Sequence, residues 1–344
     1  MGDWKGTKWV FGISMVLAGC FDRDAAPLTS RPLETILVFG VVVGQTMHGP
    51  VTEIFVGASA GPIAKVSQNP GCFSHGPALN PSGEKVVYVS CSQPYGEDLF
   101  VAVPGRLEVR ELTRTPDVEN HPRWSPDGRW IAFDNERAGN RGIVLIDSAG
   151  GQYRLIADPI LSFIFGGWSH DGSAIVCSAS GADSTESQII KIQIPSLQMQ
   201  QLTSGPGRKS NPEWSASGLV AYVRDGVLRS VRSDGTSDTL IAGPPDSVTG
   251  HISWSSDGDW LLFEGRSQGR SDVYRVSSDR GQLVNLTGNS FPGSSPTLSP
   301  DDRQIAYVAD LNGLSKIYLM EVDGSGKRPL TEFRVDEFEP SWRR

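Results

Sequence analysis

The chain lacks a basic stretch. Its 344 residues include 31 Lys and Arg against 39 Asp and Glu, which gives a formal net charge of −8 at pH 7. Proteins that bind nucleic acid neutralise its phosphates with clustered Lys and Arg. This composition therefore argues against nucleic acid as a partner.

The two long apolar runs, 9–19 and 35–44, are both too short to span a bilayer. The first run follows two lysines and has the length of a signal-peptide core. It ends in Leu17-Ala18-Gly19-Cys20, which resembles the lipobox of bacterial lipoproteins. The resemblance implies export, cleavage before Cys20 and acylation of its thiol. The alternative is an ordinary signal peptide whose cysteine is incidental.

These features divide the chain into three parts. We predict a lipoprotein signal peptide over 1–19, a lipid-anchored tether over 20–34 and a folded domain over 35–344. The protein is then expected at the bacterial cell envelope, either on the periplasmic side or at the cell surface. It would touch the membrane only through the lipid on Cys20.

The folded domain is built from one recurring pattern, best seen in HPRWSPDGRWIAF over 121–133. A strand ending at Trp124 is followed by a Ser-Pro-Asp-Gly turn and a second strand. Intervals of 45, 44, 46, 40, 44 and 44 residues separate the equivalent positions. These positions are Leu79, Trp124, Trp168, Trp214, Trp254, Leu298 and Trp342. A period near this value is typical of a propeller blade of four antiparallel strands.

Each repeat continues into a second hairpin, as in 142–157 and 315–333, which leaves no room for a helix of more than a turn or two. The run 35–44 matches a second strand and 52–69 a further hairpin, whereas the strand ending at Trp342 has nothing after it. We therefore predict an all-β propeller of seven blades, closed by joining the N- and C-terminal strands in one blade. Six blades is the alternative.

The repeat resembles a known family. Pro-x-Trp-Ser-Pro-Asp-Gly, followed by Ile-Ala-Phe and a closing Leu-Thr such as Leu112-Thr113 or Leu330-Thr331, is similar to the WD40-like PD40 repeat of TolB-type propellers. The resemblance covers 35–344 and implies the propeller. It does not extend to the N-terminal α/β domain of TolB, for which we expect no counterpart.

Propeller geometry predicts where a site would lie. The residue just before each innermost strand should point at the mouth of the central channel, on the face that also carries the long polar loops. These positions hold Gly76, His121, Phe165, Asn211, His251, Ser295 and Glu339. We predict the last six as binding residues. His121, His251 and Glu339 could hold a divalent metal, but polar residues at a wet channel need no ligand, so we assign no metal site and no cofactor.

Two signals of hydrolase chemistry are rejected. Gly57-Ala58-Ser59-Ala60-Gly61 matches the G-x-S-x-G motif, which needs a strand before and a helix after the serine, whereas Pro62 and a strand follow here. Peptidases with this repeat carry a separate hydrolase domain of roughly 200 residues, and 35–344 is taken up by blades. No catalytic residue is predicted.

Four cysteines remain to be assigned. Cys20 carries the lipid, and Cys177 lies in a strand as a small buried side chain. Cys72 and Cys91 fall on the same face of one blade, which favours a disulfide in an exported protein. A metal site of Cys72, His75 and Cys91 is the rival interpretation.

The sequence favours a non-catalytic, monomeric envelope lipoprotein that binds a protein or peptide at the channel face. The alternative is an enzyme at the same face, such as a metal-assisted polysaccharide lyase, and its support is limited to His121, His251 and Glu339.

Overall fold

The structure is a computed structural model that describes residues 36–342 except 47–48, 59–62, 70, 93–95, 107, 138, 157–160, 182–183, 243–245, 280 and 289. These residues form strands, turns and loops, and none of them forms a helix. The prediction of an all-β fold is confirmed. Nothing in the described ranges is a helix long and apolar enough to cross a membrane.

In chain order the strands are β1 (Ile36–Thr46), β2 (Gly49–Ala58), β3 (Ile63–Lys65), β4 (His75–Leu79), β5 (Val86–Cys91), β6 (Glu97–Ala102), β7 (Val109–Glu111), β8 (Val118–Trp124), β9 (Trp130–Arg137), β10 (Asn140–Asp147), β11 (Tyr153–Ile156), β12 (Leu161–Trp168), β13 (Ala174–Gly181), β14 (Ser187–Gln193), β15 (Met199–Gln201), β16 (Lys209–Trp214), β17 (Leu219–Arg224), β18 (Val227–Arg232), β19 (Thr239–Ala242), β20 (Ser247–Trp254), β21 (Trp260–Ser267), β22 (Arg270–Ser277), β23 (Val284–Asn285), β24 (Gly293–Leu298), β25 (Gln304–Asp310), β26 (Ser315–Glu321), β27 (Arg328–Pro329) and β28 (Glu337–Trp342).

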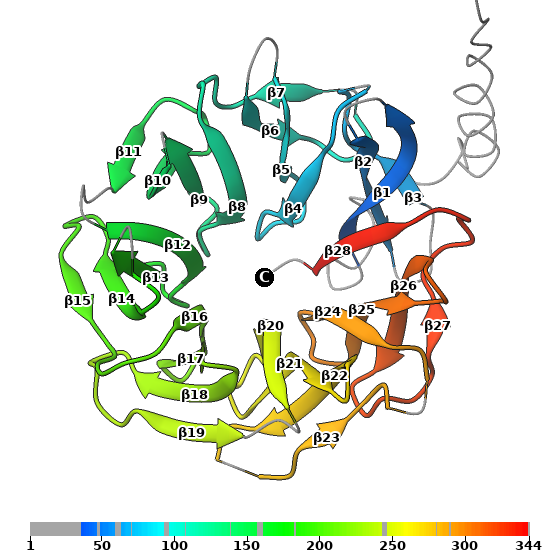
Figure 1. Ribbon diagram of the computed structural model, residues 1–344. Helices are drawn as coiled ribbons and strands as arrows, with labels where there is room; N and C mark the ends of the chain where they lie inside the picture. The colour runs from blue at the N-terminus through cyan, green and yellow to red at the C-terminus, as the bar shows by residue number, and fades with distance from the viewer. Residues whose placement is uncertain are drawn as a thin grey trace, which may run out of the picture.

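The strands group into antiparallel sheets of four that stand around a common centre (Figure 1). Five groups are separate sheets, and the eight strands β4 to β11 form two more groups that a single parallel pair, Glu97 with Val118, joins. We number the groups as blades 1 to 7, beginning with β4–β7 and ending with β28, β1, β2 and β3. In each blade the first strand lies nearest the centre and the fourth lies at the rim (Figure 1).

Blade 7 closes the ring. β28 pairs with β1 through Leu37 with Trp342 and Val41 with Glu337, and β1 in turn pairs with β2. The predicted joining of the terminal strands in one blade is confirmed. The inner strand of blade 7 therefore comes from the C-terminal end of the described chain and the other three from its beginning.

The hydrophobic core is divided among the seven interfaces between neighbouring blades. β1 illustrates the division, because Ile36 and Val38 pack against blade 1 whereas Leu37 and Phe39 pack against blade 6. A strand buried on both faces reads as a continuous apolar run rather than as an alternating one. This explains why residues 36–44 carry no polar side chain.

The Ser-Pro-Asp-Gly turns fold as their residues predict. In the turn of blade 2, Ser125 Oγ donates to Asp127 Oδ1 at 2.6 Å, and Asp127 Oδ1 accepts from the Arg129 N–H at 3.0 Å. Asp302, which replaces the turn glycine in blade 6, has φ 57° and accepts a hydrogen bond from the Ser256 N–H of blade 5. Asp tolerates this left-handed conformation better than most residues, so the substitution adds an interblade contact.

A Leu-Thr pair closes blades 1, 3, 5 and 6, and in blades 1, 3 and 5 the threonine hydroxyl accepts a buried hydrogen bond from a backbone N–H. Thr113 Oγ1 accepts from the Leu99 N–H at 2.8 Å and donates to Glu119, a carboxyl group that is completely buried. Burial raises the pKa of Glu119 to about 8. At blade 7 the equivalent carboxylate is Glu337, and the buried ammonium of Lys316 bonds it directly.

The Lys316–Glu337 pair tests how blade 7 is held. Lys316→Met leaves the Glu337 carboxylate buried without its cation, and we expect the free energy of unfolding to fall by about 3–5 kcal/mol. Urea denaturation followed by tryptophan fluorescence measures this change. The double variant Lys316→Met/Glu337→Leu removes both charges and should recover most of the loss. A single variant as stable as the parent would contradict this account.

Candidate binding face around the channel

The innermost strands share a backbone feature at the predicted positions. His121, Asn211, His251, Ser295 and Glu339 have φ between 40° and 52°, and Gly76 has φ 59°. Each of these residues lies where the pairing of the first and second strands shifts register. Non-glycine residues adopt this conformation only where the surrounding structure holds them, at a cost of about 1–3 kcal/mol each. A bulge of this kind re-aims a side chain.

Most of the predicted side chains are accessible at these bulges. His121, Asn211 and His251 are exposed, and Ser295 and Glu339 are partly exposed. Because the first strand of each blade begins at the face of the long loops, all of these residues lie toward that face. We call this surface the channel face.

Phe165 departs from the prediction. Its φ is not left-handed, and its side chain is only 6% exposed and packs in the core between blades 2 and 3. Two glycines follow it. A Cβ on Gly166 would lie 2.3 Å from the Pro212 carbonyl oxygen of blade 4. A Cβ on Gly167 would lie 3.1 Å from Glu213 Oε2. Blade 3 therefore presents no exposed side chain at this position, and its two glycines allow blade 4 to pack closely against it.

Glu213 uses this space to cross blade 3. Its carboxylate lies over Gly167 and reaches Arg123 of blade 2, with 3.8 Å between Arg123 Nη1 and Glu213 Oε1. The channel wall is thus joined across a whole blade by one ion pair.

A buried carboxylate orients His121. Asp134 Oδ2 lies 2.8 Å from His121 Nδ1, and Asp134 Oδ1 accepts a hydrogen bond from the Phe165 N–H of the next blade. The His121 side chain is 62% exposed and that of Asp134 only 3%. Burial raises the pKa of Asp134, and the bond to His121 opposes this rise. Asp134 therefore fixes the His121 ring and also ties blade 2 to blade 3.

Two further carboxylates tie neighbouring blades in the same way. Glu264 of blade 5 accepts from the Ser295 N–H of blade 6 at 3.1 Å, and Glu339 of blade 7 accepts from the Gly76 N–H of blade 1 at 2.6 Å. In each case the acceptor satisfies the N–H that the bulge removes from the strand ladder. Carboxylates thus stabilise three of the interblade junctions at the channel face.

Side chains from distant blades share one electrostatic environment at the centre. The His251 ring is exposed to water but is enclosed by the channel wall, and this enclosure lowers its pKa. The charges of Glu264 and Glu339 oppose the shift, whereas those of Arg123 and His121 add to it. Such influence fades within about 10 Å in saline water, so blades 2, 5 and 7 present these groups to a common space.

The channel side chains do not form a metal site. In the part of the chain that the structure describes, no three His, Cys, Asp or Glu side chains lie close enough together to hold a metal ion. His121, His251 and Glu339 face the same channel from three blades without converging. The donor set that the described residues offer therefore does not fit a bound divalent metal.

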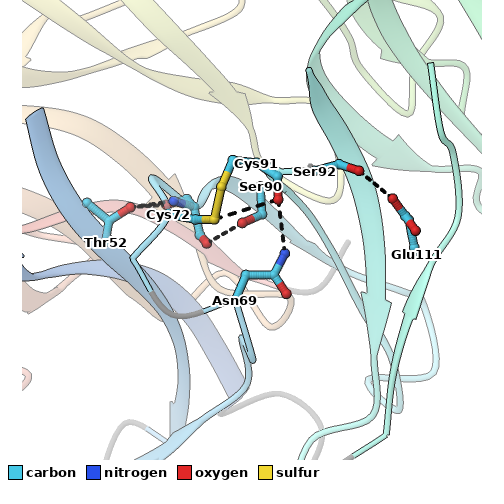
Figure 2. The surroundings of a disulfide bond; sticks show 8 residues. Thr52, Asn69, Cys72, Ser90, Cys91, Ser92 and Glu111 are labelled. Carbon is cyan, nitrogen blue, oxygen red and sulfur yellow. Dashed lines mark hydrogen bonds between the residues drawn. A yellow bond between two sulfur atoms is a disulfide. The ribbon is translucent and has the colours of Figure 1, made fainter. Parts of the chain in front are cut away.

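A disulfide anchors the loop that enters blade 1 (Figure 2). Cys72, in the loop between β3 and β4, is joined to Cys91 at the end of β5, with 5.5 Å between the two Cα atoms. The Thr52 N–H donates to the Cys72 carbonyl oxygen, and Asn69 Nδ2 donates to that of Cys91. The loop is thereby fixed to blade 7 on one side and blade 1 on the other. Both sulfurs are committed, so they are not available with His75 as metal ligands.

The remaining predicted residues lie apart from the channel face or outside the described residues. His170 is exposed in the turn of blade 3 on the opposite face, and Cys177 is fully buried in β13. Cys20, with the signal peptide and tether, and Ser59 lie outside the described residues.

Comparison with known proteins places the chain in a family. A family model described as the TolB beta propeller domain matches residues 51–248. The chain belongs to the TolB β-propeller family. Within this family the seven-fold repetition of strand, Ser-Pro-Asp-Gly turn and strand carries the resemblance predicted from the sequence.

Two proteins illustrate the range of sequence identity between this chain and its relatives. An uncharacterized protein of Agrobacterium fabrum is 32% identical over 265 residues, which are 58% of this chain and 88% of that protein. The Tol-Pal system protein TolB of Francisella tularensis subsp. mediasiatica is 23% identical over 255 residues, which are 70% of this chain and 58% of TolB. This TolB-family chain therefore matches little more than half the length of that TolB.

Solved structures share the fold at low identity. TolB from Acinetobacter baumannii superposes with a TM-score of 0.59 at 15% identity, over 97% of this chain and 94% of that one. An oligogalacturonate lyase in complex with manganese has a TM-score of 0.66 at 12% identity, over 78% and 80% of the two chains. A puromycin-hydrolyzing peptidase of Mycobacterium tuberculosis has a TM-score of 0.70 at 13% identity, over 86% of this chain and 52% of that one. These likenesses show the fold alone.

Sequence reasoning missed the groups that organise the channel face. Asp134 and Glu264 occupy the same repeat position, in the middle of the second strand, where other blades carry Val89, Ser178 or Val308. Comparing this position across the repeats would have singled out the two carboxylates. Nothing in the repeat indicates that Arg123 and Glu213 meet, because their contact crosses a blade.

Removing the disulfide tests its contribution to stability. Closing a loop of this length is worth about 3 kcal/mol in the chain-entropy account, so Cys72→Ser should lower the free energy of urea unfolding by about that amount. Dithiothreitol should lower the parent to the level of the variant and leave the variant unchanged. A parent that is insensitive to dithiothreitol would contradict the assignment.

The pKa of His251 tests the shared channel environment. We expect its ring to titrate below 6.5 in an NMR pH series, because enclosure disfavours the charged form. The unfolded chain then binds more protons below pH 6.5, so the contribution of His251 to stability falls as the pH falls through that range. Arg123→Gln should raise the pKa, and Glu264→Gln should lower it further. Arg303→Gln, on the opposite face, is the control. Equal titration in all four proteins would refute the arrangement.

Proposed function

We propose that this TolB-family protein is a non-catalytic, monomeric component of the bacterial envelope that binds a protein or peptide partner at its channel face. The recurring left-handed bulge carries the proposal, because it turns polar side chains such as His121, Asn211 and His251 toward one accessible surface. Carboxylates of neighbouring blades and a disulfide hold the backbone that presents them. A rigid scaffold with a fixed array of polar groups suits recognition of another molecule.

The envelope location rests on the N-terminal sequence and on the relatives. Cys20 follows an apolar segment of signal-peptide length and would carry the lipid anchor. Relatives named as Tol-Pal system proteins TolB support an envelope setting and a protein partner. The partner of this chain is proposed by class only.

An enzyme at the same face is the second candidate. The exposed His121 ring, oriented by the buried Asp134, favours it, because a carboxylate commonly fixes a catalytic or metal-bound imidazole. The similarity to an oligogalacturonate lyase agrees with it at the level of the fold. The separation of His121, His251 and Glu339 speaks against it, since these side chains do not converge on one point.

Site-specific photocrosslinking distinguishes these candidates. A benzophenone side chain in place of His251 should form a discrete covalent adduct with an envelope protein in living cells, because this position is exposed at the channel face. The same group in place of His170, exposed on the opposite face, is the matched control and should form no such adduct. An adduct from position 170 with none from 251 would overturn the proposal. Tight manganese binding that His121→Ala abolishes would favour the enzyme instead.

A further inference from the structure

The rim of the channel face is lowered at blade 4. There β17 and β18 have six residues each and are joined by Asp225 and Gly226, which have φ 49° and 82°. In blade 5 a two-residue turn of the same kind joins strands of eight residues, and in blade 3 strands of eight and seven residues carry a longer loop. An Asp-Gly pair with both residues left-handed makes the tightest connection between antiparallel strands. The shorter hairpin leaves a notch between its taller neighbours.

A pocket of about 370 Å³ occupies this notch. Besides the turn itself, three blades line it, with Ile164 and Ser178 from blade 3, Arg208, Asn211 and Val223 from blade 4, and Val248 from blade 5. Ile164, Val223 and Val248 supply an apolar floor. Arg208 supplies the cationic group at the rim.

The notch is rigid. The Arg208 N–H donates to Asp225 Oδ1 at 2.8 Å, and the Asp225 N–H donates to the Arg208 carbonyl oxygen at 3.0 Å. On the other side the Val248 N–H donates to the Gly226 carbonyl oxygen at 2.7 Å. The turn is therefore fixed to both walls of the pocket before any ligand arrives, which lowers the entropic cost of binding.

The repeat shows what chemistry is missing at this junction. Between blades 2 and 3 the carboxylate of Asp134 accepts the N–H at the bulge of the next blade, and Glu264 does the same between blades 5 and 6. At the junction of blades 3 and 4 the equivalent residue is Ser178, and the N–H in question is that of Asn211. No side chain in the described ranges accepts a hydrogen bond from this N–H.

The cation at the pocket is likewise without a resident counter-ion. Arg208 is exposed, and none of the arginine ion pairs among the described residues involves its guanidinium. The carboxylate of Asp225 is engaged by the Arg208 backbone instead. An exposed guanidinium and a bulge N–H thus face a space in which other junctions hold a carboxylate.

We infer that the notch binds an acidic side chain of a partner peptide, whose carboxylate takes the place that Asp134 and Glu264 fill at other junctions. Arg208 and the Asn211 N–H donate to this carboxylate, and apolar neighbours of the acidic residue rest on Ile164, Val223 and Val248. This inference rests on the proposed function and assigns to its partner an acidic residue between apolar ones. Carboxylates bonded by a guanidinium and a backbone N–H are held by charge-assisted hydrogen bonds, the stronger kind.

NMR titration of the ¹⁵N-labelled chain with capped peptides tests this assignment. The probe is acetyl-Leu-Val-Glu-Val-amide, and its control is the same peptide with Gln in place of Glu. The Glu peptide should shift the amide signals of Asn211 and Gly226 to saturation, and the Gln peptide should bind about tenfold more weakly or worse. N-acetylglutamate, which lacks the apolar neighbours, should also bind more weakly than the Glu peptide.

Three variants complete the test. Arg208→Gln should reduce affinity for the Glu peptide about tenfold or more. Arg232→Gln, at the opposite end of the same blade, should not change it. Ser178→Glu supplies a resident carboxylate at the junction and should block the peptide while the protein stays folded. Selective loss of the Glu-over-Gln preference in Arg208→Gln separates recognition from a general effect on folding.

Several results would overturn the inference. They are equal binding of the Glu and Gln peptides, equal affinity of the Arg208 and Arg232 variants, and no saturable shift at Asn211. Binding of N-acetylglutamate as tight as that of the peptide would overturn the peptide as ligand. If crosslinking from position 251 persists while the notch fails these tests, the proposed function stands without it. If the notch binds the Glu peptide but position 251 forms no adduct, the channel-face partner fails instead.

Discussion

Pairing between β28 and β1 is the interaction on which the ring depends. Each four-stranded blade has two apolar faces, and each face is buried only because another blade lies against it. Alternate residues of β1 fill the interfaces on both sides of blade 7, so two of the seven parts of the core meet at this one strand. With β28 in place every blade has two neighbours, and the sheet faces have no exposed end.

Hydrophobic packing holds the blades together, and carboxylates set their detailed arrangement at the channel face. The bulges of the innermost strands free backbone N–H groups from the strand ladder, and Asp134, Glu264 and Glu339 each satisfy one such group on the next blade. The same bulges expose the side chains on which recognition depends. Stability and binding are therefore coupled through the backbone of the innermost strands, and a junction without its carboxylate is available to an outside ligand.

The regular part of the fold could be predicted from the sequence, because one repeat specifies turn, strand alternation and period at once. The positions of the bulge residues around the channel could also be predicted, since equivalent repeat positions in a propeller lie at equivalent places around the axis. The prediction that the Phe165 side chain points at the channel mouth was wrong. Its position in the repeat does not reveal that blade 4 packs against Gly166 and Gly167. Contacts that join residues of different blades, such as Arg123 with Glu213, break the repeat symmetry, and no single repeat encodes them. The notch could have been found by comparing, between blades, the length of the hairpin that joins the second and third strands.

The origin of the inner strand of blade 7 also sets an order of events in folding. Blades 1 to 6 are each made from consecutive strands, so they can form from the N-terminal side as the chain emerges. In blade 7 one edge of the apolar strand β1 stays unpaired until residues 337–342, which are far from it in sequence, have been synthesised and can pair with it. This contact has the longest sequence separation in the ring, and long-range pairing is slow because the loop must close first. Completion of the ring is thus a late step, during which the edge of β1 is the part of the chain most exposed to pairing with other molecules.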